Sequence, residues 1–143
     1  MNSKYTNYIP AIVFFAFIIG LIVQVDLNKK NLLIDIVHKI PFGDKLGHFI
    51  LFGILALLVN MAMRFRKARL LGRHFHIGSV LVLLFAVVEE FSQLAFSSRT
   101  FDLVDMLFDL FGVGLLSSIG FREHFIKQLR NLTKGISEKM MVD

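Results

Sequence analysis

The chain has 143 residues, of which 55% are hydrophobic, with 16 Phe, no Cys and no Trp. This composition is far more apolar than that of a soluble domain of the same length, and the absence of Cys excludes disulfides and thiol chemistry. The formal net charge of +5 comes from Lys and Arg that avoid the apolar segments, so it follows membrane topology and we expect no nucleic-acid partner. The sequence therefore predicts a small helical membrane protein with the lipid bilayer as its first partner.

Four apolar segments have roughly the ~20 residues that a helix needs to cross a bilayer. We predict membrane-spanning helices at residues 9–25, 47–63, 77–96 and 103–119. Between the first two, Leu33, Ile36 and Ile40 recur at helical spacing, which predicts a short helix on the outer membrane surface that ends before Pro41. The expected fold class is therefore an all-α, polytopic membrane protein with four transmembrane helices in a compact bundle.

Beyond the fourth span, apolar residues again recur every three or four positions, beginning with Phe121 and Phe125, and basic residues lie on the opposite face. This pattern predicts a C-terminal amphipathic helix that lies in the plane of the membrane. We assign residues 1–121 to a membrane domain and residues 122–143 to a basic cytoplasmic tail.

The distribution of basic residues predicts the orientation. The segment 64–73, the tail and Lys4 lie on one side of the membrane, and together they hold 11 of the 16 Lys and Arg residues. By the positive-inside rule we expect both termini in the cytoplasm, with the protein in the cytoplasmic membrane. We expect residues 64–76 on that side to form a solvated loop.

Polar residues enter the second span at its outer end. Asp44 and His48 are four residues apart and share a helix face, so the carboxylate could orient the imidazole and raise its basicity. The alternative is purely structural, with Asp44 as a helix cap, Lys45 reaching for the interface and His48 buried with its hydrogen bonds satisfied.

Two further polar blocks lie at the same level of the membrane. Glu89, Glu90 and Gln93 end the third span, and the cost of carboxylates in hydrocarbon predicts that they are paired, protonated or hydrated. The fourth span begins with three carboxylates on one face, from residue 102 to residue 109. Topology brings the blocks to one level, so we predict a water-accessible outer pocket, with scattered interfacial charges as the alternative. Its residues are Lys45, His48, Glu89, Glu90, Gln93, Arg99 and Asp105.

Three functions fit such a pocket, and the residues alone leave open whether the protein is an enzyme. The first is binding of an outer-leaflet amphiphile or cell-wall precursor, with the cations meeting phosphate or carboxylate and the acids meeting amines or hydroxyls. The binding residues would be Lys45, Gln93, Arg99, Asp102, Asp105 and Asp109.

The second function is a metal-dependent hydrolase or transferase acting on a lipid-linked envelope substrate. His48 would be the general base, oriented by Asp44, and Glu89 and Glu90 would complete the catalytic set. Glu89, Glu90 and Asp105 would hold a divalent metal, for which Mg²⁺ or Mn²⁺ fits oxygen ligands best. The third function, a small proton-coupled transporter, would require a homo-oligomer because four spans make a narrow conduit.

The same blocks carry a family resemblance. The segments 41–49, 89–93 and 99–105 contain an Asp-Lys-x-x-His block, a Glu-Glu-x-x-Gln block and an Arg-to-Asp block in order. In these blocks the chain resembles the VanZ-like family of bacterial membrane proteins. It departs from the family's pattern at Asp109, where Asn is usual. An Asp that replaces an amide donor there would have to be protonated to imitate it. The resemblance implies a cell-envelope protein, with a founding member tied to resistance against teicoplanin-type antibiotics, and it supplies no established reaction. Its motif residues are Asp44, Lys45, His48, Glu89, Glu90, Gln93, Arg99 and Asp105.

Overall fold

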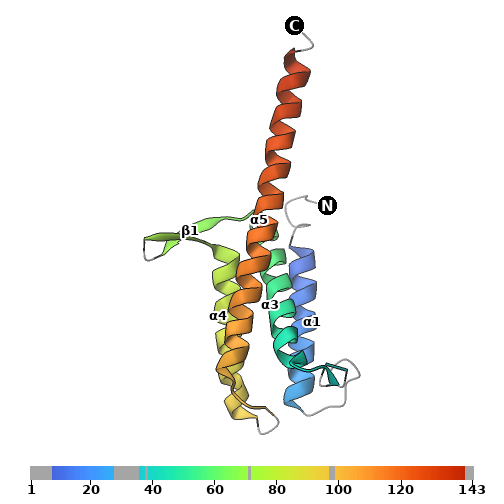
Figure 1. The fold of residues 1–143 in the computed structure, drawn as a ribbon, viewed down its shortest axis with the longest axis vertical. Coiled ribbons are helices and arrows are strands. Elements are labelled where there is room, and N and C mark those ends of the chain that lie inside the picture. Colours follow the sequence, from blue (N-terminus) through green and yellow to red (C-terminus); the bar gives the residue numbers. More distant parts are fainter. Residues whose placement is uncertain (1–7, 28–35, 38, 71, 97–98, 141–143) are drawn as a thin grey trace.

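The computed structural model describes residues 8–27, 36–37, 39–70, 72–96 and 99–140. Its long elements are helices that stand side by side in one bundle (Figure 1). They are α1 (Ile9–Asp26), α3 (Gly43–Ala62), α4 (Ile77–Ser92) and α5 (Leu103–Met140). Four helices are long and apolar enough to cross a membrane, with α4 extended by the short 3₁₀ helix η1 (Gln93–Ala95), so the predicted spans and the all-α membrane fold are confirmed.

The predicted outer surface helix falls mainly on residues 28–35 and 38, which lie outside the described residues. Of its remainder, Ile36, Val37 and Lys39 are helical. The chain then turns at Phe42, whose φ of 58° lies in the left-handed region, and α3 begins at Gly43. Gly43 lies against the backbone carbonyl of Val37, and a side chain there would collide with it. This tight turn starts α3 four residues earlier than the predicted span.

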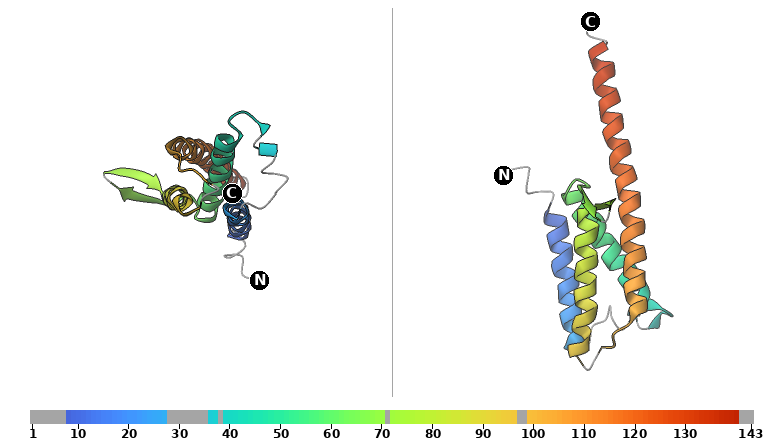
Figure 2. Two further views of the ribbon diagram at one scale, coloured as in Figure 1. Left: turned by 90° about the horizontal axis from the view of Figure 1, so that it is seen from below. Right: turned by 90° about the vertical axis from the view of Figure 1, so that its left-hand side faces the viewer.

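Helix α3 contacts each of the other three long helices and crosses the bundle obliquely (Figure 2). It approaches α5 most closely, because Gly53 and Gly112 remove side chains from the crossing. A side chain on Gly112 would run into the backbone of Phe49. The buried core surrounds this crossing and consists of Ile18, Phe52, Leu55, Ala56, Val82, Ala86 and Val113.

A small uncharged cluster joins α3, α4 and α5. The Asn60 side-chain amide donates to the hydroxyls of Ser79 at 2.8 Å and Ser117 at 3.0 Å, and the two hydroxyls lie 2.9 Å apart. Asn60 is fully buried. We call these three residues the Asn–Ser cluster. It ties together the three helices that also carry the polar blocks.

The connection between α3 and α4 is a β-hairpin. Residues 66–69 and 72–75 are exposed, as expected for a solvated segment, but they belong to a hairpin where a loop was expected. Strand β1 (Lys67–Leu70) pairs antiparallel with β2 (Arg73–His76), and the hairpin projects sideways from the bundle (Figure 1). The imidazole of His76 packs 5.6 Å from the ring of Phe65 and 5.1 Å from that of Phe121. These aromatic contacts anchor the base of the hairpin. The basic composition of the segment did not predict this packing.

The C-terminal segment is helical, as predicted, but it is not a separate helix in the membrane plane. Helix α5 runs unbroken from Leu103 to Met140 and extends well beyond the bundle (Figure 1). No proline interrupts it, and Gly120 lies within the helix against Leu57 and Phe65. The start of α1 and the far end of α5 point to the same end of the molecule, which we call the tail end; the opposite end is the site end.

Candidate functional site

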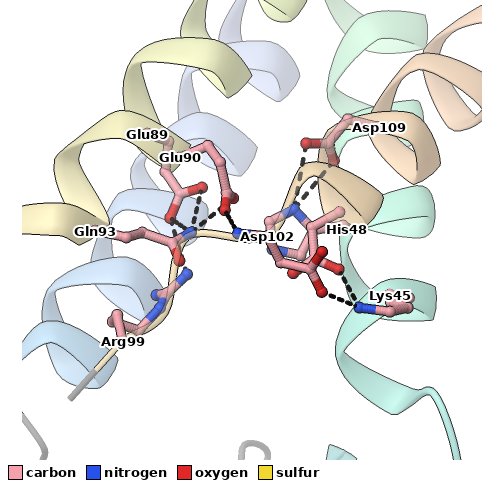
Figure 3. A network of polar contacts seen from close by, with 9 residues as sticks. Lys45, His48, Glu89, Glu90, Gln93, Arg99, Asp102 and Asp109 are labelled. Carbon is pink, nitrogen blue, oxygen red and sulfur yellow. Dashed lines mark hydrogen bonds and ion pairs between the residues drawn. The ribbon is translucent and has the colours of Figure 1, made fainter.

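The polar blocks meet at the site end of the bundle (Figure 3). They come from the first turns of α3, the last turn of α4 with η1, the loop that follows, and the first turns of α5. We call the residues that interact there the charged cluster. It consists of Lys45, His48, Glu89, Glu90, Gln93, Arg99, Asp102, Asp105 and Asp109.

Lys45 connects α3 to the start of α5. Its ammonium lies 2.6 Å from Asp102 Oδ2 and 2.9 Å from Asp105 Oδ1. Asp102 also accepts a hydrogen bond at 2.8 Å from the backbone N–H of Val104, which caps the first turn of α5. The Lys45 ammonium and this N–H lower the pKa of Asp102. The resulting charge-assisted bonds fix the two helices relative to each other at this end.

His48 is held by Asp109 and not by Asp44. Nδ1 of His48 lies 3.2 Å and 3.3 Å from the two carboxylate oxygens of Asp109, and the pair is buried. Asp44, which we expected to orient the imidazole, is exposed and makes no hydrogen bond to it within the described structure. An ionised Asp109 can accept a hydrogen bond from the Nδ1–H group of His48, so it need not imitate the amide donor expected from the family pattern.

Gln93 holds the paired glutamates of α4. Its side-chain N–H groups donate to both oxygens of Glu89 at 3.2 Å and to Oε2 of Glu90 at 2.9 Å. Glu90 Oε1 accepts from the backbone N–H of Asp102, so this carboxylate also anchors the loop that precedes α5. Glu90 is fully buried, at 0% exposed.

Arg99 closes the cluster from the loop side. Its guanidinium lies 3.1 Å from Oε1 of Glu89 and 3.6 Å from Oδ1 of Asp26. Asp26 is the last residue of α1, and sequence analysis did not select it. The available signal was its position at the end of the first span, on the same side of the predicted bundle as the polar blocks.

A cavity of about 290 Å³ opens beside the cluster. One wall is apolar and comes largely from α1, through Ile18, Leu21, Ile22 and Val25. The other wall is polar and consists of Asp44, His48, Glu89, Gln93, Arg99 and Thr100. The other members of the cluster do not line the cavity and lie behind this wall: Lys45, Glu90, Asp102, Asp105 and Asp109. The space thus has the mixed character of a site for a molecule with an apolar part and a polar part.

Two groups of side chains within the described residues offer ligand atoms close enough to share a metal ion. One group is His48, Glu89 and Glu90, all buried, and the other is Asp44, His48 and Asp105. The set suggested by the sequence, Glu89, Glu90 and Asp105, is divided between them, because Asp105 is engaged by Lys45. His48 belongs to both groups and is therefore central to any metal chemistry here.

A comparison with protein families matches residues 1–121 to the VanZ/LLP1 family. The chain belongs to the VanZ/LLP1 family. The match covers the four-helix bundle and stops where α5 leaves it. Comparisons with curated proteins and with solved structures gave no match. The family assignment agrees with the resemblance carried by the three polar blocks.

Proposed function

We propose that this VanZ/LLP1 protein binds an amphiphile of the bacterial cell envelope in the cavity at its site end. The observation that carries the proposal is the division of the cavity into an apolar wall from α1 and a polar wall from α3, α4 and the following loop. An acyl or prenyl chain fits the first wall and a hydrogen-bonding head group fits the second. Candidate ligands are an outer-leaflet lipid, a lipid-linked cell-wall precursor or a lipoglycopeptide of the teicoplanin type.

The contacts of the cations favour a head group rich in hydroxyls or amines. Lys45 and Arg99 are each shared by two carboxylates, so a phosphate would have to displace one of them. Carboxylate and amide oxygens on the polar wall accept hydrogen bonds from sugar hydroxyls and ammonium groups directly. This reverses the expectation that the two cations bind the ligand themselves.

Filling the cavity tests the proposal. Gly47 lines the cavity and Gly114 lies on the exposed face of α5, and at both positions an added Cβ meets no atom within 4 Å. We expect G47L to lose most of the lipid adducts that native mass spectrometry detects on protein purified from bacterial membranes. G114L should retain them, because it adds the same side chain to a helix glycine outside the cavity. Equal retention by both variants would contradict the proposal.

The proposal includes an orientation, with both termini in the cytoplasm and the site end facing outward. It rests on the basic residues, since the segment 64–73 and the tail both lie at the tail end. The chain has no Cys, so single-cysteine variants report cleanly. We expect T100C to react with an impermeant maleimide in intact cells and Q128C to react only after permeabilisation. The reverse pattern would place the cavity on the cytoplasmic side.

A second candidate function is hydrolysis or group transfer on a lipid-linked substrate. The contact between His48 and Asp109 favours it, because a carboxylate that accepts from Nδ1 leaves Nε2 of this cavity-lining imidazole as the basic nitrogen. H48Q would then abolish turnover of a lipid-linked cell-wall precursor while adducts of that precursor persist. Binding without turnover in the wild-type protein supports the first function alone.

A further inference from the structure

The charged cluster contains more carboxylates than basic groups. Its ion pairs in the described part of the chain use Lys45, Arg99 and His48. Lys45 and Arg99 each serve two carboxylates, and His48 serves one. The cluster has five carboxylates, and Asp26 of α1, which pairs with Arg99, makes six that face three basic groups. Three negative charges remain uncompensated when all are ionised, even with His48 protonated.

Glu90 is the carboxylate of the cluster that has no basic partner among the described residues. It is 0% exposed, and its hydrogen bonds come from the neutral amide of Gln93 and the backbone N–H of Asp102. It forms no ion pair with any residue that the structure describes. A buried charge without a partner is strongly destabilising, so Glu90 needs either a proton or an additional cation.

The surroundings of His48 indicate that the missing group is a cation and not a proton on Glu90. Its side chain is 9% exposed, lines the cavity and directs Nδ1 at Asp109. Nε2 has no hydrogen-bond partner among the described residues. An imidazole held by a carboxylate through one nitrogen, with the other nitrogen free, is how histidine is prepared to bind a metal.

We propose that His48, Glu89 and Glu90 bind one hard divalent cation of the Mg²⁺ or Mn²⁺ class at the polar wall of the cavity. One ligand atom from each residue lies within 4.8 Å of the other two. Ligand atoms about 2.1 Å from an octahedral Mg²⁺ are about 3.0 Å apart when adjacent and about 4.2 Å apart when opposite, so the three side chains would move toward one another on binding. Two carboxylates with a single imidazole suit Mg²⁺ or Mn²⁺, whereas structural zinc sites use more nitrogen or sulfur ligands.

As a metal ligand His48 is neutral, so four negative charges remain uncompensated, and the proposed cation cancels two of them. Asp109 then has the role of a positioning residue for His48. This inference rests on the proposed function, because the cation lies on the wall that receives the head group. There it offers open coordination positions to hydroxyl or phosphate oxygens of the ligand. A phosphate head group, which the engaged Lys45 and Arg99 disfavour, becomes acceptable through the metal.

The test is a titration of the full chain in phosphatidylcholine nanodiscs with Mn²⁺, followed by electron paramagnetic resonance of the free ion. We expect saturable binding of one Mn²⁺ per chain, displaced by excess Mg²⁺. E89Q and E90Q keep the side-chain shape and should each weaken binding tenfold or more. D109N should weaken it by roughly ten- to a hundredfold, as expected for a carboxylate behind a histidine ligand. E123Q, at the exposed tail end, is the matched control and should bind as the wild type does.

The outcomes separate this inference from the proposed function. A wild-type protein that binds no Mn²⁺ above the level of empty nanodiscs, or E89Q and E90Q proteins that bind as tightly as wild type, overturns the metal site. A rise in melting temperature with Mn²⁺ that is present in wild type and absent in either Gln variant supports it. Lipid adducts counted on the same samples in EDTA report on the cavity separately, so their loss or retention tests the proposed function independently of Mn²⁺.

Discussion

The Asn–Ser cluster and the charged cluster join the same three helices and differ in almost everything else. The first is uncharged, lies toward the tail end, and its amide and hydroxyls bond to one another across α3, α4 and α5. The second is charged, lies at the site end and lines a cavity. If holding helices together were the only requirement, the uncharged design would serve at both levels at lower desolvation cost.

This difference indicates that the charged cluster is the functional one. Interhelical hydrogen bonds of neutral groups stabilise membrane bundles modestly and need no solvent access. Ionisable groups inside a membrane protein are expensive and are expected where a ligand, ion or proton must be met. In this chain the ionisable groups of the charged cluster lie at the cavity, and the neutral groups of the Asn–Ser cluster lie between the helices. Four measurements sharpen this contrast.

The largest effect is expected from K45M. Removing the ammonium leaves the buried Asp105 and the part-exposed Asp102 beside each other without their shared cation, so we expect a larger loss of stability than for the changes below. Reversible unfolding in mixed detergent micelles measures the loss. K45M/D105N should recover part of it by removing one uncompensated charge, and K127M, at the exposed tail end, should be nearly neutral. Equal stability of K45M and wild type would show that the pair holds nothing together.

N60A should have an intermediate effect. It removes two hydrogen bonds from a fully buried side chain, and together with the lost packing we expect a cost of about 1–2 kcal/mol in the same assay. Ligand retention should be unchanged, because Asn60 is remote from the cavity wall. A variant that kept its stability and lost its lipid adducts would reverse the division of roles between the clusters.

S79A should cost less, about 0.6 kcal/mol, because the amide of Asn60 keeps its bond to Ser117. Its control is S118A on the exposed face of α5, which removes a hydroxyl whose hydrogen bond within the described structure goes to the backbone carbonyl of Gly114. Unfolding experiments on the pair isolate the interhelical bond. A larger loss for S118A than for S79A would contradict the assignment.

The smallest effect concerns the pH dependence of Asp102. Its pKa is lowered by Lys45, so the stabilisation is present above the ordinary carboxyl pKa of about 3.9 and is lost as pH falls through the lowered value. Carboxyl-carbon NMR titration of wild type and K45M measures the shift directly. We expect the Asp102 pKa to rise in K45M, and an unchanged titration would mean that the backbone N–H of Val104 alone holds it down.

Much of the architecture could be predicted because it depends on properties that are local in sequence. Runs of apolar residues give the spans, and their alternation brings the polar blocks to one end. Helix rotation is not local, which is why Asp44 was paired with His48 on the basis of spacing while Asp109, from a different helix, is the true partner. Asp26 was missed for the same reason, since its contact with Arg99 crosses from α1 to a loop.

The hairpin and the straight course of α5 were not predicted, because composition and periodicity do not determine them. The basic segment 64–76 looked like solvated chain, and only the packing of His76 on Phe65 and Phe121 shows why it folds as a hairpin. The C-terminal helix was recognised from its periodicity, but periodicity does not tell whether a helix bends at the membrane surface. Asn60 was a signal that could have been used, as a lone amide in an apolar span calls for a partner.

The crossing of α3 and α5 at Gly53 and Gly112 has a consequence for how such proteins diversify. Its backbone contact leaves no room for side chains, so these two positions are closed to substitution while the frame persists. Lys45 and His48 on one helix, and their acidic partners on the other, project from this frame one to three turns away. Changes in these projecting side chains therefore leave intact the support that sets their separation.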